Sequence, residues 1–217
     1  MTSKIYNLVK GSIETERAAR LISDWFNPLL MPPLALGILA YSIVLPAARV
    51  LLLFAIALLF YSILPLITAL YISRNGGSDS LDFTLKSSRK VLYGISVISA
   101  FAGVMLMFLY FEENSVRLTA SIFLVNLIAA LLLNFRWKVS VHSAAVTTAG
   151  VCLLLFSRAG SEMAYPAASG LLLLCVILPL VSWSRYKLGV HSIPELLGGV
   201  LLGLVLTAVT VIFWPFA

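Results

Sequence analysis

The stretch Val50–Ser73, VLLLFAIALLFYSILPLITALYIS, runs for 24 residues without one charged side chain. About 20 apolar residues in a helix cross the ~30 Å hydrocarbon core of a bilayer, so this stretch predicts a transmembrane helix. The rest of the chain is similar, because 61% of its 217 residues are hydrophobic and only 11% are charged. Typical soluble domains are about 45–50% apolar and about 25% charged. An ordinary soluble, disordered or disulfide-framework protein is therefore excluded.

Six further uncharged runs of 18 to 23 residues occur along the chain. They are Phe26–Ala48, Val91–Phe111, Leu118–Phe135, Val139–Ser157, Met163–Trp183 and Leu196–Ala217. Together with the first stretch they predict an all-α, polytopic integral membrane bundle of about seven transmembrane helices, forming a single domain over residues 26–217. Pro28, Pro32 and Pro33 crowd the start of the first run, and a re-entrant first segment would leave six. The tryptophans Trp25, Trp137, Trp183 and Trp214 lie at or beside the run ends, as in the aromatic belts of membrane proteins.

Residues 1–25 form a charged head that lacks the apolar stretch of a signal peptide. We interpret it as a basic interfacial or cytoplasmic segment, with one amphipathic helix as its simplest structure. The net charge of +6 is explained by the excess of Lys and Arg in cytoplasmic loops, so no nucleic acid partner is expected. Cys152 and Cys175 lie in the middle of runs among Leu and Val, where a cysteine behaves as a small buried hydrophobe.

The polar residues gather in three loops, over residues 74–90, 136–143 and 184–195. Two runs separate each loop from the next, so the three loops share one side of the membrane. Both histidines of the chain, His142 and His191, lie in these loops.

This set of residues suits phosphate chemistry. Lys86, Arg89 and Arg185 are cations that can bind phosphate oxygens. One imidazole can attack phosphorus, and a second can protonate the leaving oxygen. The spacing of the histidines, cysteines and carboxylates does not match a zinc or magnesium site, so we expect no metal and no cofactor.

The three loops resemble the signatures of the type 2 phosphatidic acid phosphatase superfamily. Ser184-Arg185, five residues, His191, three residues and Glu195 is similar to the third signature, S-R-x5-H-x3-D. Ser140-Val141-His142 is similar to the second, P-S-G-H, and Lys86-Ser87-Ser88-Arg89 to the basic first signature, K-x6-R-P. The resemblance covers residues from about 82 to 203.

The resemblance implies a metal-independent enzyme that hydrolyses a lipid phosphate or diphosphate, either phosphatidate-like or polyprenyl. His191 would be the nucleophile that forms a phosphohistidine, Glu195 would orient its imidazole, and His142 would be the general acid. The substrate phosphate would be bound by four residues, Lys86, Arg89, Ser140 and Arg185. The partners implied are the lipid substrate and the bilayer, and the sequence does not predict an oligomeric state.

The chain departs from the family pattern at several positions. Val139 and Val141 stand in place of the proline and glycine of the second signature, and Glu195 replaces an aspartate. Two apparent spans separate the first two signatures, where the better-known six-helix members have one loop. These departures indicate a divergent branch and leave two alternatives open: a lipid phosphotransferase, and a non-catalytic lipid-phosphate binder or transporter.

Simpler interpretations exist for the same residues. Lys86, Arg89 and Lys90 are also typical of charges that anchor a helix end to anionic lipid. His142 is also compatible with a helix cap or an interfacial position. Ser192-Ile193-Pro194-Glu195 reads as a capping box at the start of the last helix, which explains Glu195 without catalysis.

The basic residues predict the orientation of the chain. With seven spans, the head and the three loops carry 12 of the 15 Lys and Arg residues, and the opposite side carries Arg49, Arg117 and Arg158. The positive-inside rule therefore places the head and the three loops in the cytoplasm.

Overall fold

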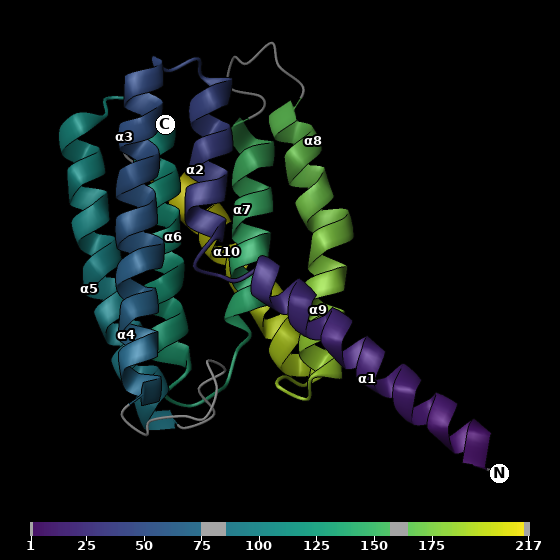
Figure 1. Cartoon of the computed structure of the whole chain (residues 1–217). Helices are drawn as coiled ribbons and strands as arrows, with labels where there is room; N and C mark the ends of the chain where they lie inside the picture. The colour runs from purple at the N-terminus through teal and green to yellow at the C-terminus, as the bar shows by residue number, and fades with distance from the viewer. Residues whose placement is uncertain (1, 75–85, 157–164, 215–217) are drawn as a thin grey trace.

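We describe a computed structural model of the chain, which covers residues 2–74, 86–156 and 165–214, with side chains from residue 13 in the first helix and from residue 90 in the fifth. These residues form helices joined by short turns (Figure 1). The helices are α1 (Thr2–Trp25), α2 (Met31–Ser42), α3 (Ala47–Ala57), η1 (Leu58–Ile63), α4 (Leu64–Ile72), α5 (Lys86–Tyr110), α6 (Asn114–Leu133), α7 (Val141–Phe156), α8 (Tyr165–Leu172), η3 (Leu173–Ile177), α9 (Leu178–Lys187) and α10 (Ile193–Ile212).

Five continuous helices are long and apolar enough to cross a membrane: Ala47–Ile72, Lys90–Tyr110, Asn114–Leu133, Tyr165–Lys187 and Ile193–Ile212. The prediction of an all-helical, membrane-embedded protein is therefore confirmed among the described residues. The predicted runs Phe26–Ala48 and Val139–Ser157 contain shorter helices, α2 with 12 residues and α7 with 16. At 1.5 Å per residue, α2 is only about 18 Å long.

The prolines of the first run start a helix. Pro32 and Pro33 lie in the first turn of α2, where the missing backbone N–H of proline would have no helical partner in any case. Two other prolines, Pro65 and Pro179, lie just after the π-helical turns η1 and η3 inside long helices. Widening the turn before a proline relieves the clash of its ring with the preceding carbonyl, so both helices continue through their prolines.

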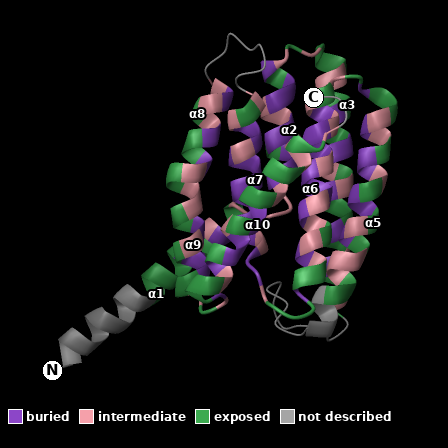
Figure 2. Cartoon of the chain, turned by 180° about the vertical axis from the view of Figure 1, so that it is seen from behind, coloured by how far each residue is buried: buried purple, intermediate pink, exposed green. Residues whose placement is uncertain are grey.

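The helices pack side by side, and α1 projects obliquely from the lower part of the bundle (Figure 1). Its last turns pack on α9, while α10 packs on α7 and α6, and α5 packs on α6. Buried residues face the interior, and apolar side chains cover much of the outer surface (Figure 2). Ile98, Leu109 and Leu51 are each at least 70% exposed, which suits a surface covered by lipid.

Glycines allow α10 to approach α7 closely. A Cβ atom at Gly199 would collide with the backbone carbonyl of Ser140, and one at Gly203 would lie 2.7 Å from the carbonyl oxygen of Ala144. These two glycines are four residues apart, the small-xxx-small spacing of membrane helix contacts. Gly199 and Gly203 therefore serve the packing of α10 on α7.

We expect Gly199→Ala to lower the unfolding temperature in detergent, because backbone atoms cannot move aside and the two helices must separate. Overpacking of this kind costs about 1–3 kcal/mol. Gly94→Ala in α5 is the matched control, because a Cβ there meets no atom within 4 Å. Equal unfolding temperatures for the two variants would contradict this account.

Candidate active site

The site begins at the C-terminal end of α9, where the helix stops in a Schellman turn. Gly189 adopts a positive φ of 66°, which favours glycine. The Gly189 N–H donates to the carbonyl of Tyr186, and the Val190 N–H to that of Arg185. The chain is thereby turned back on the helix, and the His191 N–H donates to the same Arg185 carbonyl at 3.3 Å. This turn accounts for the five residues that separate Arg185 from His191 in the sequence.

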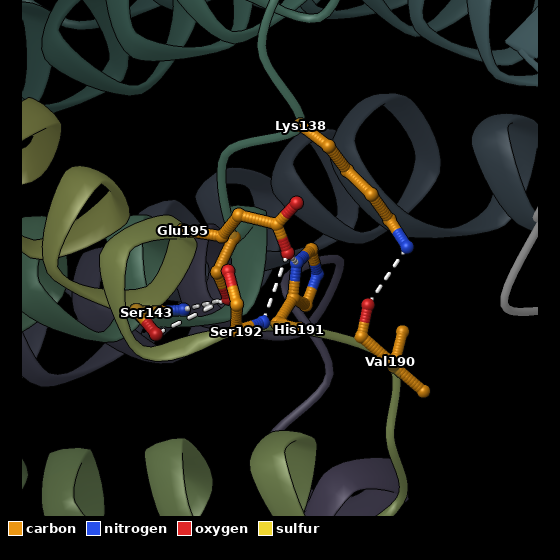
Figure 3. A network of polar contacts seen from close by, with 7 residues as sticks. Lys138, Ser143, Val190, His191, Ser192 and Glu195 are labelled. Atoms are coloured by element: carbon orange, nitrogen blue, oxygen red, sulfur yellow. Dashed lines mark hydrogen bonds and ion pairs between the residues drawn. The ribbon is translucent and has the colours of Figure 1, made fainter.

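Glu195 holds the ring of His191. The distance from His191 Nδ1 to Glu195 Oε2 is 3.1 Å, and the same carboxylate oxygen accepts the Ser192 N–H at 3.0 Å (Figure 3). The predicted capping box of Ser192 and Glu195 is present at the start of α10. One carboxylate therefore caps α10 and fixes the imidazole. With Nδ1 donating to Glu195, Nε2 is the nitrogen whose lone pair is available for reaction.

The beginning of α7 is attached to the same structure. Ser140 lies at the N-cap position, where its hydroxyl accepts hydrogen bonds from the Ser143 N–H and hydroxyl, and its own N–H donates to the Glu195 carbonyl at 3.0 Å. The side chain of Ser140 is fully buried. Its role as a phosphate ligand stays a prediction, and the contacts seen are those of a helix cap that joins α7 to α10.

A residue from the head holds Arg185. The Arg185 Nη1 donates to the hydroxyl of Ser23 at 2.8 Å. Ser23, Arg185, His142 and His191 are all buried. His142 and His191 both lie close enough to Arg185 to interact electrostatically with its positive charge. Segments at residues 23, 142, 185 and 191 thus converge on one place.

Lys138 completes the group of positive charges. Its Nζ donates to the carbonyl of Val190 at 2.7 Å, directly beside His191 (Figure 3). Burial lowers the pKa of His191 to about 4, helped by the positive charges of Arg185 and Lys138 and opposed by Glu195. At neutral pH the imidazole is therefore uncharged, which is the state that a nucleophile needs.

A cavity of about 190 Å³ opens from this group into the bundle. Its polar end is lined by Lys138, His142, Arg185 and His191. Its remaining wall is mainly apolar and is contributed by helices α4 to α7 and by the segment that joins α1 to α2.

The first basic signature is only partly described. The backbones of Lys86 and Arg89 lie in the first turn of α5, but their side chains lie outside the described residues, and their role stays a prediction. The neighbouring Lys90 lies over the ring of Phe135, with its Nζ 4.8 Å from the ring centroid. Because Phe135 directly follows α6, the start of α5 lies at the same end of the bundle as the histidines.

Two residues of the site were not assigned a role from the sequence. Lys138 lies in the second polar loop, so its charge and its position beside the predicted site residues could have identified it. Ser23 gave no signal, because a serine near the end of an amphipathic helix looks like any other polar residue. Only the packing of α1 on α9 brings it to Arg185.

If His191 is the nucleophile, we expect the acid limb of kcat/KM to lie near pH 4 instead of near the ordinary histidine pKa of about 6.5. Lys138→Met should move this limb to higher pH, because it removes a positive charge that opposes protonation of His191. Glu195→Gln should move it to lower pH, because Glu195 favours protonation. Profiles of kcat/KM between pH 3.5 and 8 check both directions, and an unchanged limb in both variants would contradict the assignment.

No protein-family model, no curated protein and no solved structure matches this chain. The described residues define an all-helical protein with helices able to cross a membrane. At one end of its bundle lie two buried histidines and a buried arginine, with a half-buried carboxylate and a half-buried lysine beside them.

Proposed function

We propose that this chain hydrolyses a lipid phosphate or diphosphate, phosphatidate-like or polyprenyl, through a phosphohistidine on His191. The observation that carries the proposal is the pairing of His191 Nδ1 with Glu195 at 3.1 Å beside buried Arg185, at the end of an apolar cavity. Such an arrangement offers a neutral nucleophile, a cation for phosphate oxygens and a space for a hydrocarbon tail.

In the proposed reaction, the lone pair of His191 Nε2 attacks the terminal phosphorus, and the bond from this phosphorus to the oxygen that joins it to the rest of the lipid breaks. The leaving oxygen takes a proton from His142. It departs on the lipid alcohol when the substrate is a monophosphate and on the lipid monophosphate when the substrate is a diphosphate. A water molecule then attacks phosphorus, gives a proton to His142 and breaks the bond between nitrogen and phosphorus. Inorganic phosphate leaves, and both histidines return to their starting states. Arg185 stabilises the charge on the phosphoryl oxygens throughout.

The proton on His142 is best supplied together with the substrate. Arg185 and His142 line the same end of the cavity, so the positive charge of Arg185 disfavours a proton on the His142 ring. A phosphate with two negative charges offsets the charge of Arg185, so binding of substrate favours the protonated His142 that a general acid requires.

The test is phosphate release by the purified protein in detergent, with dioleoyl phosphatidate, lysophosphatidate and farnesyl diphosphate as substrates. We expect release that survives EDTA and is inhibited by vanadate. Strict dependence on an added divalent metal would contradict the mechanism. Formation of a phosphorylated acceptor alcohol without release of inorganic phosphate would identify a phosphotransferase. Binding without transfer or release would identify a lipid-phosphate binder or transporter.

We further propose seven membrane crossings, in which α2 and α7 cross together with their flanking residues. The head and the site then share one side, and the 12 Lys and Arg residues there predict that this side is cytoplasmic. Arg185, Lys86 and Arg89 would be needed on whichever side the substrate enters, but without them the count is still 9 against 3.

Labelling of single cysteines tests the orientation. With Cys152 and Cys175 replaced, Lys187→Cys at the site end should react with an impermeant thiol reagent only after cells are permeabilised. Glu112→Cys, which is exposed in the turn between α5 and α6 at the opposite end, should react in intact cells. The reverse pattern would place the site outside.

A further inference from the structure

The mainly apolar wall of the cavity includes polar side chains. Asn126, Asn134 and Thr148 line it and are each at least 94% buried. Asn126 and Asn134 each use the amide NH2 group to donate to a carbonyl one turn back in α6. The Oδ1 atoms of both and the hydroxyl of Thr148 have no hydrogen-bond partner within the described part of the chain.

Because the three side chains line the cavity, we expect these atoms to find a partner on a molecule that binds there. A buried polar atom without a hydrogen bond is destabilising. Because an amide oxygen only accepts, whatever occupies the cavity next to Asn126 and Asn134 must donate. The cavity, at about 190 Å³, exceeds the engineered cavity of about 150 Å³ that holds benzene in another protein, so it has room for more than water.

The polar atoms lie at two depths. Asn134 directly follows α6 at the end of the bundle that carries the histidines, and Asn126 lies eight residues earlier, about 12 Å deeper at 1.5 Å per residue. Thr148 lies six residues beyond His142 on α7, about 9 Å deeper. Asn126 and Thr148 therefore form a polar level roughly 10 Å inside the bundle, between apolar wall residues such as Leu92, Phe123 and Leu127.

We propose that the cavity binds a lipid phosphate whose tail carries a hydrogen-bond donor, a hydroxyl or an amide N–H, roughly 10 Å from phosphorus. This inference rests on the proposed function, because it places the phosphate at Arg185 and His191. Within the proposed class of lipid phosphates, it favours a tail that carries a donor. A polyprenyl chain has no donor, and the ester groups of a diacyl phosphatidate only accept, so we expect both to be weaker substrates than a lipid phosphate with a donor in its tail.

Three alkyl phosphates test the inference: hexadecyl phosphate, its 8-hydroxy derivative with the hydroxyl roughly 10 Å from phosphorus in an extended chain, and its 14-hydroxy derivative as a control of equal polarity. We expect the wild-type protein to favour the 8-hydroxy compound over both others by at least about fivefold in kcat/KM, since one satisfied buried acceptor is worth about 1 kcal/mol or more.

Variants locate the effect. Asn126→Leu should abolish the preference for the 8-hydroxy compound over hexadecyl phosphate, and Thr148→Val should weaken it. Thr147→Val is the matched control, because Thr147 is also fully buried with an unpartnered hydroxyl among the described residues but does not line the cavity. Loss of the preference in Thr147→Val alone, or its persistence in Asn126→Leu, would overturn the inference.

Binding separates this inference from the proposed function. We would measure the shift in unfolding temperature of the His191→Ala protein with each compound. A larger shift with the 8-hydroxy compound, without hydrolysis of any compound by the wild type, would contradict the proposed function and support the donor site. Hydrolysis of all three compounds at equal rates would support the proposed function and contradict the donor site. Equal shifts or no shifts would mean that water satisfies Asn126 and Thr148, and the inference would fail.

Discussion

His191→Ala should abolish phosphate release, because it removes the only protein atom that forms a bond to phosphorus in the proposed mechanism. The variant should still fold in detergent. The backbone turn at Gly189 does not use the imidazole, and the capping box is made by Ser192 and Glu195. Phosphate release from a lipid phosphate and the unfolding temperature are the two measurements. A fully active His191→Ala protein would eliminate the mechanism.

Glu195→Gln is the informative companion to this variant. The amide keeps the shape of the side chain and an oxygen that can accept one hydrogen bond, but it loses the charge. It removes no bond-forming atom, so the rate should fall far less than in His191→Ala. An equal loss in both variants would mean that Glu195 takes part in bond making or that α10 needs its carboxylate to fold, and the unfolding temperature distinguishes these.

Arg185→Ala should lower kcat/KM by about 10²–10³, the usual effect of removing one preorganised charge contact to a transition state. Arg185 is 4% exposed and is held by Ser23, so its guanidinium is already oriented before substrate arrives. Arg185→Lys should restore only part of the activity, because an ammonium group cannot form the two-point contact of a guanidinium with phosphate.

Ser23→Ala provides the control for this contact. Ser23 positions Arg185 and does not itself bind phosphate, so the variant should lose less activity than Arg185→Ala. Ser23→Thr, which keeps the hydroxyl, should recover the activity. If Ser23→Ala and Arg185→Ala lose activity equally, the serine does more than position the arginine.

The fold class could be predicted from the sequence because it depends on local composition. Runs such as Val50–Ser73 are too long and too apolar for water, and a helix is the structure that satisfies their backbone in lipid. The capping box at Glu195 is also local, so its residues predicted it. The length of α2 was not predictable from the sequence. The turn that ends this helix after Ser42 depends on packing against neighbouring helices.

The site was decided by tertiary structure. The motif spacing brought His191 and Glu195 together, because the capping box turns the Glu195 carboxylate back toward the residues just before α10. Nothing in the spacing predicted that Ser23 would hold Arg185, because 162 residues separate them and only the packing of α1 on α9 joins them. The polar level formed by Asn126 and Thr148 could not be predicted from the sequence either. Each residue reads as an isolated polar side chain in an apolar run, and only the arrangement of α6 beside α7 turns them toward one cavity.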